Sequence, residues 1–324
     1  MKEEDKSKRG NMQSLKRWVT SLGILCVMLA ATNIWVVTAY VPDKKDGISE
    51  NAVQQYPLLN PARELYEKND LIINVQPLRD YLNKTYEADS NVSIYFEYLP
   101  TGASIAISKD AEFWPASLLK IPVAMAVAKK IEKGVWRWDN KLVLMAADKD
   151  DTFGSLYKEP TGSIFTIEEL VKRSLADSDN TANVILLRNL EVKEVTDVYD
   201  HIGLSDFLSS DGKISAKRYS VILRSLYNSS YLSEENSQKL ISFLTHTPFT
   251  EYLAHALPEQ VVFAHKIGID NIKNVYLDSG IVYTHNRPYL LTAMVQSEDE
   301  QMAQDIFQGI SEKVYTYVSN YREE

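Results

Sequence analysis

The most apolar part of the chain lies near its start, where residues 18–41 contain no charged side chain. A helix of this length, at about 1.5 Å per residue, crosses a bilayer core of roughly 30 Å, so the pattern predicts a transmembrane helix. Basic residues cluster before it, and such residues beside a first span hold that end in the cytoplasm. The expected organisation is a cytoplasmic tail over residues 1–17, the span, an extracytoplasmic spacer over 42–70 and a folded domain over 71–324.

A cleaved signal peptide is the alternative interpretation of this segment. The apolar regions of signal peptides run about 7–15 residues, and no small-x-small cleavage motif follows residue 41. We therefore expect an uncleaved single-pass anchor in the cell membrane, with the N-terminus in the cytoplasm and the folded domain outside.

Within the folded domain, the spacing of apolar residues alternates between strand and helix periods. Strands are predicted at 92–99, 103–108, 261–269, 277–283 and 289–296. Helices are predicted at 71–86, 117–133, 166–175, 181–190, 216–227, 234–245 and 301–318. Strands at both ends of the domain imply one sheet, so we expect an α+β fold: an antiparallel sheet built from both ends, with flanking helices and an inserted all-helical subdomain.

Composition excludes several classes of function. Hydrophobic residues make up 45% and charged residues 24%, which is typical of a packed globular protein. The formal net charge of −9 over 324 residues argues against a nucleic-acid partner. Cys26, the single cysteine, lies in the predicted span, and the five histidines form no pair at helical ligand spacing. We therefore expect no intramolecular disulfide, no metal and no cofactor.

A serine and a lysine three residues apart open the predicted helix 117–133. Residues at this spacing share a helix face, so the Lys120 amine is within reach of the Ser117 hydroxyl. Lys120 would be a base only if burial or a neighbouring cation lowered its pKa. The pair is a candidate nucleophile and base, although the same spacing begins at Ser155 and Ser210, where solvated loops are expected.

Two further motifs follow along the chain. A single Ser-Asp-Asn run, with Ser178 and Asn180 at its ends, comes 61 residues after Ser117. Its alternative role is to cap the next predicted helix. Lys266 and Gly268 then form a Lys-x-Gly motif on a predicted strand, where the alternative is an edge-strand lysine followed by a bulge.

The order of these three motifs, and the stretch 154–190 around the second, resemble the penicillin-recognising serine hydrolases, closest to the class A β-lactamases. The resemblance covers residues 71–319 with gaps and is most specific at 166–170 and 178–183. It implies a β-lactamase- or transpeptidase-like fold and an acyl-enzyme mechanism.

This resemblance implies a catalytic role for four of the motif residues. Ser117 would attack a strained lactam or peptide carbonyl, and Lys120 would assist as base. Ser178, hydrogen-bonded to Lys266, would pass a proton to the departing nitrogen.

The resemblance also implies how substrate is held. Asn180 would bind the acylamide of the substrate, and Gly268 would let the strand backbone approach it. The backbone N–H of Ile269 would complete an oxyanion hole with that of Ser117. The implied partner is a small-molecule β-lactam or a cell-wall peptide.

Two departures from the family pattern change the expected chemistry. Ile267 follows Lys266 where the family carries a hydroxyl residue, so binding of a substrate carboxylate should weaken by about 10–150-fold. The family's Glu-x-x-Leu-Asn loop, whose glutamate activates the deacylating water, is absent. Residues 203–216 stand in its place with only Asp206 and Asp211 as carboxylates. An acyl-enzyme is therefore expected to form and to break down slowly.

Three functions stay open on the sequence alone. The first is a membrane-anchored serine hydrolase acting on β-lactams outside the membrane. The second is a penicillin-binding-type D-Ala-D-Ala peptidase or slow acyl-transferase acting on cell-wall peptides. The third is a catalytically degenerate binding module, suggested by Ile267 and the missing loop. The complete set of acylation residues favours the first.

Overall fold

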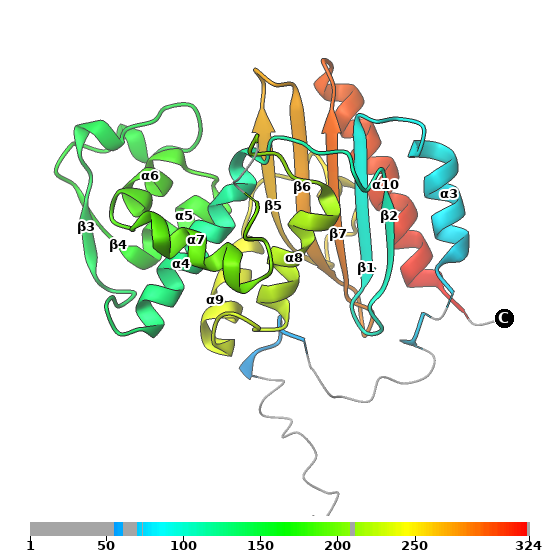
Figure 1. Ribbon diagram of the computed structural model, residues 1–324, viewed down its shortest axis with the longest axis horizontal. Coiled ribbons are helices and arrows are strands. Elements are labelled where there is room, and N and C mark those ends of the chain that lie inside the picture. The colour runs from blue at the N-terminus through cyan, green and yellow to red at the C-terminus, as the bar shows by residue number, and fades with distance from the viewer. Residues whose placement is uncertain (1–54, 61–69, 73, 208–210, 323–324) are drawn as a thin grey trace, which may run out of the picture. The chain divides into compact units, whose positions relative to one another are not determined.

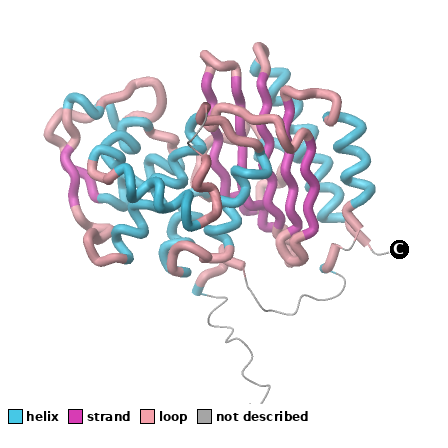
Figure 2. Tube along the Cα trace, viewed as in Figure 1, coloured by secondary structure: helices cyan, strands magenta, loops and turns pink. Residues whose placement is uncertain are grey.

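A computed structural model describes residues 55–60, 70–72, 74–207 and 211–322. A helical part lies beside an antiparallel sheet, and further helices cover the far face of that sheet (Figures 1 and 2). The predicted α+β fold class is confirmed. The transmembrane helix predicted over residues 18–41 lies outside the described residues, and no helix within them has both the length and the apolar character that a membrane span needs.

Five antiparallel strands form the main sheet, in the order β2-β1-β7-β6-β5. They are β1 (Val92–Tyr98), β2 (Ala103–Ile107), β5 (Val262–Asp270), β6 (Val275–Tyr283) and β7 (Tyr289–Gln296). Because β1 pairs with β7, strands from the two ends of the domain meet inside the sheet, as the apolar pattern predicted. The helices α3 (Gln76–Tyr86) and α10 (Glu300–Asn320) lie on one side, and α8 (Ala216–Tyr227) packs on the other.

The helical part is inserted between β2 and β5. Its α-helices, besides α8, are α4 (Lys120–Glu132), α5 (Ile167–Ala176), α6 (Asn180–Arg188), α7 (Val192–His201) and α9 (Glu234–Leu244). It also contains a two-stranded sheet of β3 (Lys141–Val143) and β4 (Ile164–Thr166), so the expectation of an all-helical insertion was wrong. Each strand has three residues, too few for an alternating pattern to be visible in the sequence.

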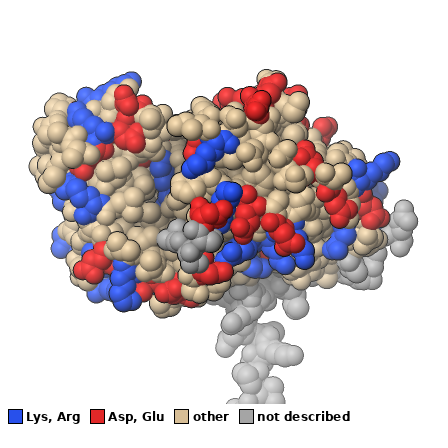
Figure 3. Space-filling view, turned by 45° about the horizontal axis from the view of Figure 1, so that its top comes forward, with Lys and Arg blue, Asp and Glu red and all other residues tan. Residues whose placement is uncertain are grey.

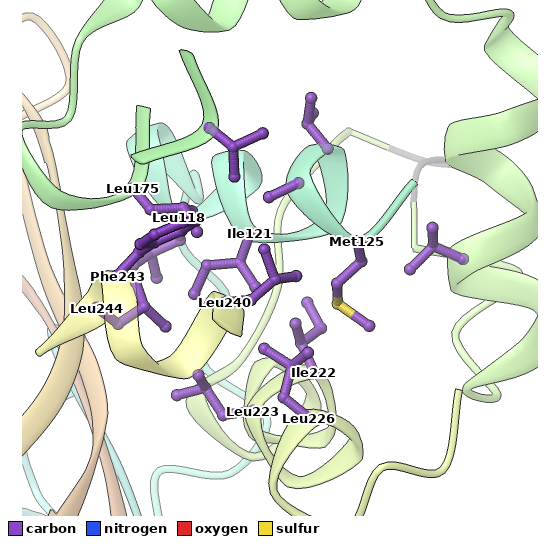
Figure 4. Close-up of a cluster of buried hydrophobic side chains, with 14 of the residues drawn as sticks. Leu118, Ile121, Met125, Leu175, Ile222, Leu223, Leu226, Leu240, Phe243 and Leu244 are labelled. Carbon is purple, nitrogen blue, oxygen red and sulfur yellow. The ribbon is translucent and has the colours of Figure 1, made fainter. Parts of the chain in front are cut away.

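The helix α4 lies at the centre of the helical part. In Figure 4 its Ile121 and Met125 side chains lie beside Leu240 of α9 and Ile222 of α8. The same buried cluster includes Leu277 and other apolar residues of the main sheet. The helical part and one face of the sheet therefore share a single core.

A second apolar cluster lies on the opposite face of the sheet. Phe96 and Tyr289 of the strands are buried there together with Phe307 and Ile310 of α10. The two faces of the sheet therefore differ: one packs on α10, and the other faces the helical part, where the motif residues lie.

One helix begins later than predicted, and another was not predicted. The helix predicted over 71–86 begins only at Gln76, and Pro77 occupies its first turn, where no N–H is needed. The helix α7 was not predicted, because it begins with a capping box of Glu191 and Glu194 and not with one of the usual short polar cap residues.

Charged side chains of both signs are mixed over the surface shown in Figure 3. Lys and Arg lie among Asp and Glu, and acidic side chains gather near the centre and at the upper edge of this face. The mixture is typical of a solvent-exposed protein surface.

Candidate active site

Ser117 lies on a 3-10 turn, η2 (Ala116–Leu119), which leads directly into α4. The sequence predicted an α-helix starting at Ser117. In the 3-10 turn found instead, residues three apart lie one above the other. Lys120 begins α4, and its Nζ lies 3.1 Å from Ser117 Oγ. The serine and lysine of the first motif are therefore in contact.

Contacts with neighbouring elements hold η2 in place. The Leu118 carbonyl accepts a hydrogen bond from the Tyr219 hydroxyl of α8 at 2.9 Å. On β5, a Cβ atom at Gly268 would lie 3.1 Å from the Pro115 carbonyl oxygen and 3.2 Å from the Leu118 side chain. Glycine at 268 therefore lets β5 approach the turn that carries Ser117, a contact that the sequence did not predict.

The Ser-Asp-Asn run lies at the N-terminus of α6. Asp179 is the N-cap, since its Oδ1 accepts a hydrogen bond from Ala182 N at 2.9 Å. Ser178 precedes it with a φ of 55°, a strained conformation for a residue with a side chain. Lys120 Nζ donates to the Ser178 carbonyl at 2.5 Å and to Asn180 Oδ1 at 2.6 Å, and lies 3.2 Å from Ser178 Oγ. One amine thus joins the first two motifs.

The environment of Lys120 favours its neutral form. The residue is 4% exposed, and burial lowers the pKa of its amine from the ordinary value to about 8. The carboxylates of Asp179 and Asp150 act in the opposite direction and limit the shift. With a pKa near 8, a measurable fraction of Lys120 is unprotonated at neutral pH, as a base requires.

Lys266 lies on β5, the strand of the main sheet nearest the helical part in Figure 1, and is almost completely buried. Burial, followed by the positive charge of Lys120, holds the pKa of Lys266 well below its usual range. Its Nζ donates to the Ile267 carbonyl at 3.3 Å. Among the described residues no hydrogen bond joins it to Ser178 Oγ, so the contact implied by the resemblance is not formed here. Lys266 lies close enough to Lys120 for the charge of Lys120 to act on it.

The family model of the beta-lactamase enzyme family, Beta-lactamase2, matches residues 76–318. The chain belongs to this family. Beta-lactamase VEB-1 of Pseudomonas aeruginosa is 22% identical over 241 residues, which are 67% of this chain and 79% of that protein.

Solved structures of other proteins share the fold. The structure of PBP-A matches with a TM-score of 0.69 at 21% identity, covering 76% of this chain and 97% of that one. A beta-lactamase from Sphaerobacter thermophilus also matches with a TM-score of 0.69, at 20% identity, covering 78% of this chain and 100% of that one.

In this member of the beta-lactamase enzyme family, a cavity of about 410 Å³ opens beside the nucleophile candidate. Its polar lining includes Ser117, Lys120 and Asn180, and Ile269 of β5 lines it as well. The other apolar and aromatic lining residues are Trp114, Ala116, Leu119, Val123, Leu187, Val195 and Tyr199. The region next to Ser117 is therefore largely apolar.

The segment between α7 and α8 supplies no described carboxylate to this cavity. Asp206 and Asp211 form ion pairs with Arg218 and Lys213 and are not among the lining residues. Asp270 is the acidic residue in the described lining, and its Oδ1 accepts hydrogen bonds from two backbone N–H groups of its own turn. No described residue at the cavity thus corresponds to the family's deacylating glutamate.

Ile267 points away from the motif residues. Side chains alternate along a strand, so Lys266 and Gly268 project from one face of β5 and Ile267 from the other. Ile267 is 2% exposed and belongs to the apolar cluster beneath α10. This position therefore offers neither a hydroxyl nor an accessible side chain to a substrate carboxylate.

Sequence reasoning missed two polar neighbours of Asn180. The Asp150 carboxylate and the Thr152 hydroxyl lie 3.2 Å and 2.7 Å from Asn180 Nδ2, although they precede it by 30 and 28 residues. Their segment has no helical or strand period. The only local signal is a run of short polar side chains, which is typical of a turn.

Proposed function

We propose that the protein is a serine hydrolase of β-lactamase type that β-lactams acylate at Ser117. Membership of the beta-lactamase enzyme family supports this, as does the contact between Ser117 and Lys120. A mutant of PBP-A, which matches this chain with a TM-score of 0.68 at 21% identity, was solved as an acyl-enzyme complex with penicillin G.

The surroundings of Lys120 Nζ are the observation that carries the proposal. Its two shortest contacts, at 2.5 Å and 2.6 Å, end on the Ser178 carbonyl and on Asn180 Oδ1, which only accept hydrogen bonds. A neutral amine has two N–H groups for these two acceptors. Its lone pair is then left for the hydroxyls of Ser117 and Ser178, at 3.1 Å and 3.2 Å. Lys120 is thus placed to take the Ser117 proton.

Acylation would proceed in two steps from this arrangement. Ser117 Oγ bonds to the lactam carbonyl carbon while its proton moves to Lys120 Nζ. The backbone N–H groups of Ser117 and Ile269 hold the resulting oxyanion, and each such donor contributes about 10²–10³ in rate. The C–N bond then breaks, and the proton held by Lys120 Nζ passes through the Ser178 hydroxyl to the leaving nitrogen, which returns Lys120 to its neutral form.

Hydrolysis of the acyl-enzyme would be slow. A positioned general base contributes about 10²–10⁴ in rate, and the described lining beside Ser117 is largely apolar. This lining also favours a second candidate function, a penicillin-binding-type D-Ala-D-Ala peptidase or slow acyl-transferase acting on cell-wall peptides.

Labelling with a fluorescent penicillin tests the nucleophile. The wild-type protein should acquire one adduct, located at Ser117 by peptide mass mapping, and Ser117→Ala should remove it without unfolding the protein. Ser155→Ala is the matched control, since Ser155 begins the same serine–lysine spacing on a different turn, and it should label like wild type.

The lifetime of the adduct separates the candidate functions. An adduct that persists for many minutes, and whose formation a D-Ala-D-Ala peptide reduces by competition, supports the peptidase. Rapid release of opened penicillin supports a true β-lactamase. If several β-lactams give neither an adduct nor released opened product after long incubation, both functions are refuted and a binding module is left.

We also propose that residues 18–41 anchor the protein in the cell membrane and place the domain outside. The support is the uncharged sequence of that segment and the basic residues before it. In an expressing host, carbonate extraction should leave the full chain in the membrane fraction. The double variant Leu25→Lys, Leu29→Lys should be released, and extraction of the wild-type chain would contradict the anchor.

A further inference from the structure

We infer that Asp150 is a positioning residue for Lys120, acting through Asn180. The inference rests on the proposed acylation of Ser117 and adds a member to its machinery. Asp150 lies on the segment between the 3-10 turns η3 (Ala146–Asp148) and η4 (Leu156–Lys158), outside all three sequence motifs.

The backbone of Asp150 is fixed against the first turn of α6. Its N–H donates to Thr181 Oγ1 at 3.0 Å, and its carbonyl accepts from the same hydroxyl at 3.0 Å. Thr181 is completely buried. Because both backbone groups of Asp150 bond to Thr181, its carboxylate is held beside the Ser-Asp-Asn run.

The Asp150 carboxylate determines which way the Asn180 amide faces. Asp150 Oδ1 accepts from Asn180 Nδ2 at 3.2 Å, from Thr152 N at 2.9 Å and from the Thr152 hydroxyl. A flipped amide would turn its oxygen toward this carboxylate and its NH₂ toward the Lys120 amine, which would be unfavourable on both sides. Asp150 thus keeps the Asn180 oxygen directed at Lys120 Nζ, 2.6 Å away.

This network also occupies the hydrogen-bonding groups of Asn180. Its Nδ2 donates to Asp150 and, at 2.7 Å, to Thr152 Oγ1, while its Oδ1 accepts from Lys120. An amide has two N–H donors, and both are engaged. Asn180 is thus better placed to orient Lys120 than to bind the acylamide of a substrate.

Charge gives Asp150 a second effect on Lys120. Its carboxylate raises the pKa of Lys120 against the effect of burial, and Lys120 in turn helps to lower the pKa of Asp150. Asp179 acts on Lys120 in the same direction as Asp150, and Lys266 is a neighbouring buried amine whose own pKa is lowered. When Lys120 takes the Ser117 proton, the new positive charge is therefore formed near the Asp150 carboxylate.

The variant Asp150→Asn tests the charge, because an Asn Oδ1 still accepts the same hydrogen bonds. The readout is the single-turnover rate of acylation by a chromogenic β-lactam as a function of pH. In the wild type this rate should rise with a midpoint near 8, as Lys120 loses its proton. Removing a negative charge lowers the pKa of Lys120, so the midpoint should fall by roughly 0.5–1 pH unit. A weaker base and a less stabilised cation should lower the plateau by about 3–30-fold.

Two further variants separate charge from structure. Asp151→Asn removes the charge of the exposed neighbouring residue and should leave the profile unchanged. Thr152→Val keeps the Asp150 charge but removes the hydroxyl that Asn180 contacts. It should lower the plateau without moving the midpoint.

The outcomes also separate this inference from the proposed function. A wild-type protein that is not acylated refutes the proposed function. If the wild type is acylated and Asp150→Asn keeps its midpoint, the positioning role is refuted and the nucleophile assignment stands. Should Asp150→Asn fail to fold, an unchanged plateau in Thr152→Val would refute the inference.

Discussion

Replacing Lys120 with methionine should lower the rate of acylation at Ser117 by about 10²–10⁴-fold. Methionine is unbranched, is one atom shorter than lysine and suits a buried position, so the chain should still fold. It has no amine lone pair to accept the Ser117 proton. The measurement is the single-turnover acylation rate at pH 8, with circular dichroism to confirm folding.

A lysine on the same helix provides the control for this prediction. Lys133 lies at the C-terminal end of α4 and is exposed, so Lys133→Met should acylate at the wild-type rate. If Lys120→Met acylates within about threefold of wild type, another group accepts the proton and the mechanism proposed above is wrong.

The variant Asp179→Ala should lower the free energy of unfolding by about 3–5 kcal/mol. The Asp179 carboxylate is 1% exposed and accepts hydrogen bonds from three backbone N–H groups, those of Ser155 at 2.7 Å, Leu156 at 2.8 Å and Ala182 at 2.9 Å. Alanine would leave these donors without a partner in a site that is closed to water. Urea unfolding followed by fluorescence gives the change.

Two related variants test whether the Asp179 carboxylate itself is the cause of this loss of stability. Asp179→Asn should not restore stability, because its NH₂ group would face N–H donors that require an acceptor. Asp177→Ala, at an exposed position two residues away, should change the free energy of unfolding by less than about 0.5 kcal/mol. A loss below about 1 kcal/mol in Asp179→Ala would show that the carboxylate does not hold this segment.

The features of the site that the sequence predicted depend on short-range geometry. Ser117 and Lys120 are three residues apart, so any helical turn brings them together, and the structure does so with a 3-10 turn. The main sheet was predictable because its strands are long enough for their apolar residues to show a period. The side of β5 on which Ile267 lies also follows from alternation along the strand, once Lys266 is assigned to the opposite face.

The features that sequence reasoning missed depend on contacts between distant segments. Asp150 acquires its role only because the loop before η4 folds back on α6, where Asp179 binds the N–H groups of Ser155 and Leu156. The Lys266 amine was expected to contact Ser178, but its partner is the carbonyl of Ile267. The hydrogen-bond partners of such side chains depend on rotamers and packing, which no periodic pattern in a single sequence encodes.

The core shared by the helical part and the sheet also limits changes in the width of the cavity beside Ser117. Side chains of α4 and of strands β5, β6 and β7 belong to one continuous apolar cluster. Among the described residues this cluster continues from the helical part to the sheet, so neither half can move away from the other without exposing it to water. The width of this cavity should therefore be nearly constant. The helical part and the sheet should also unfold together in one cooperative transition.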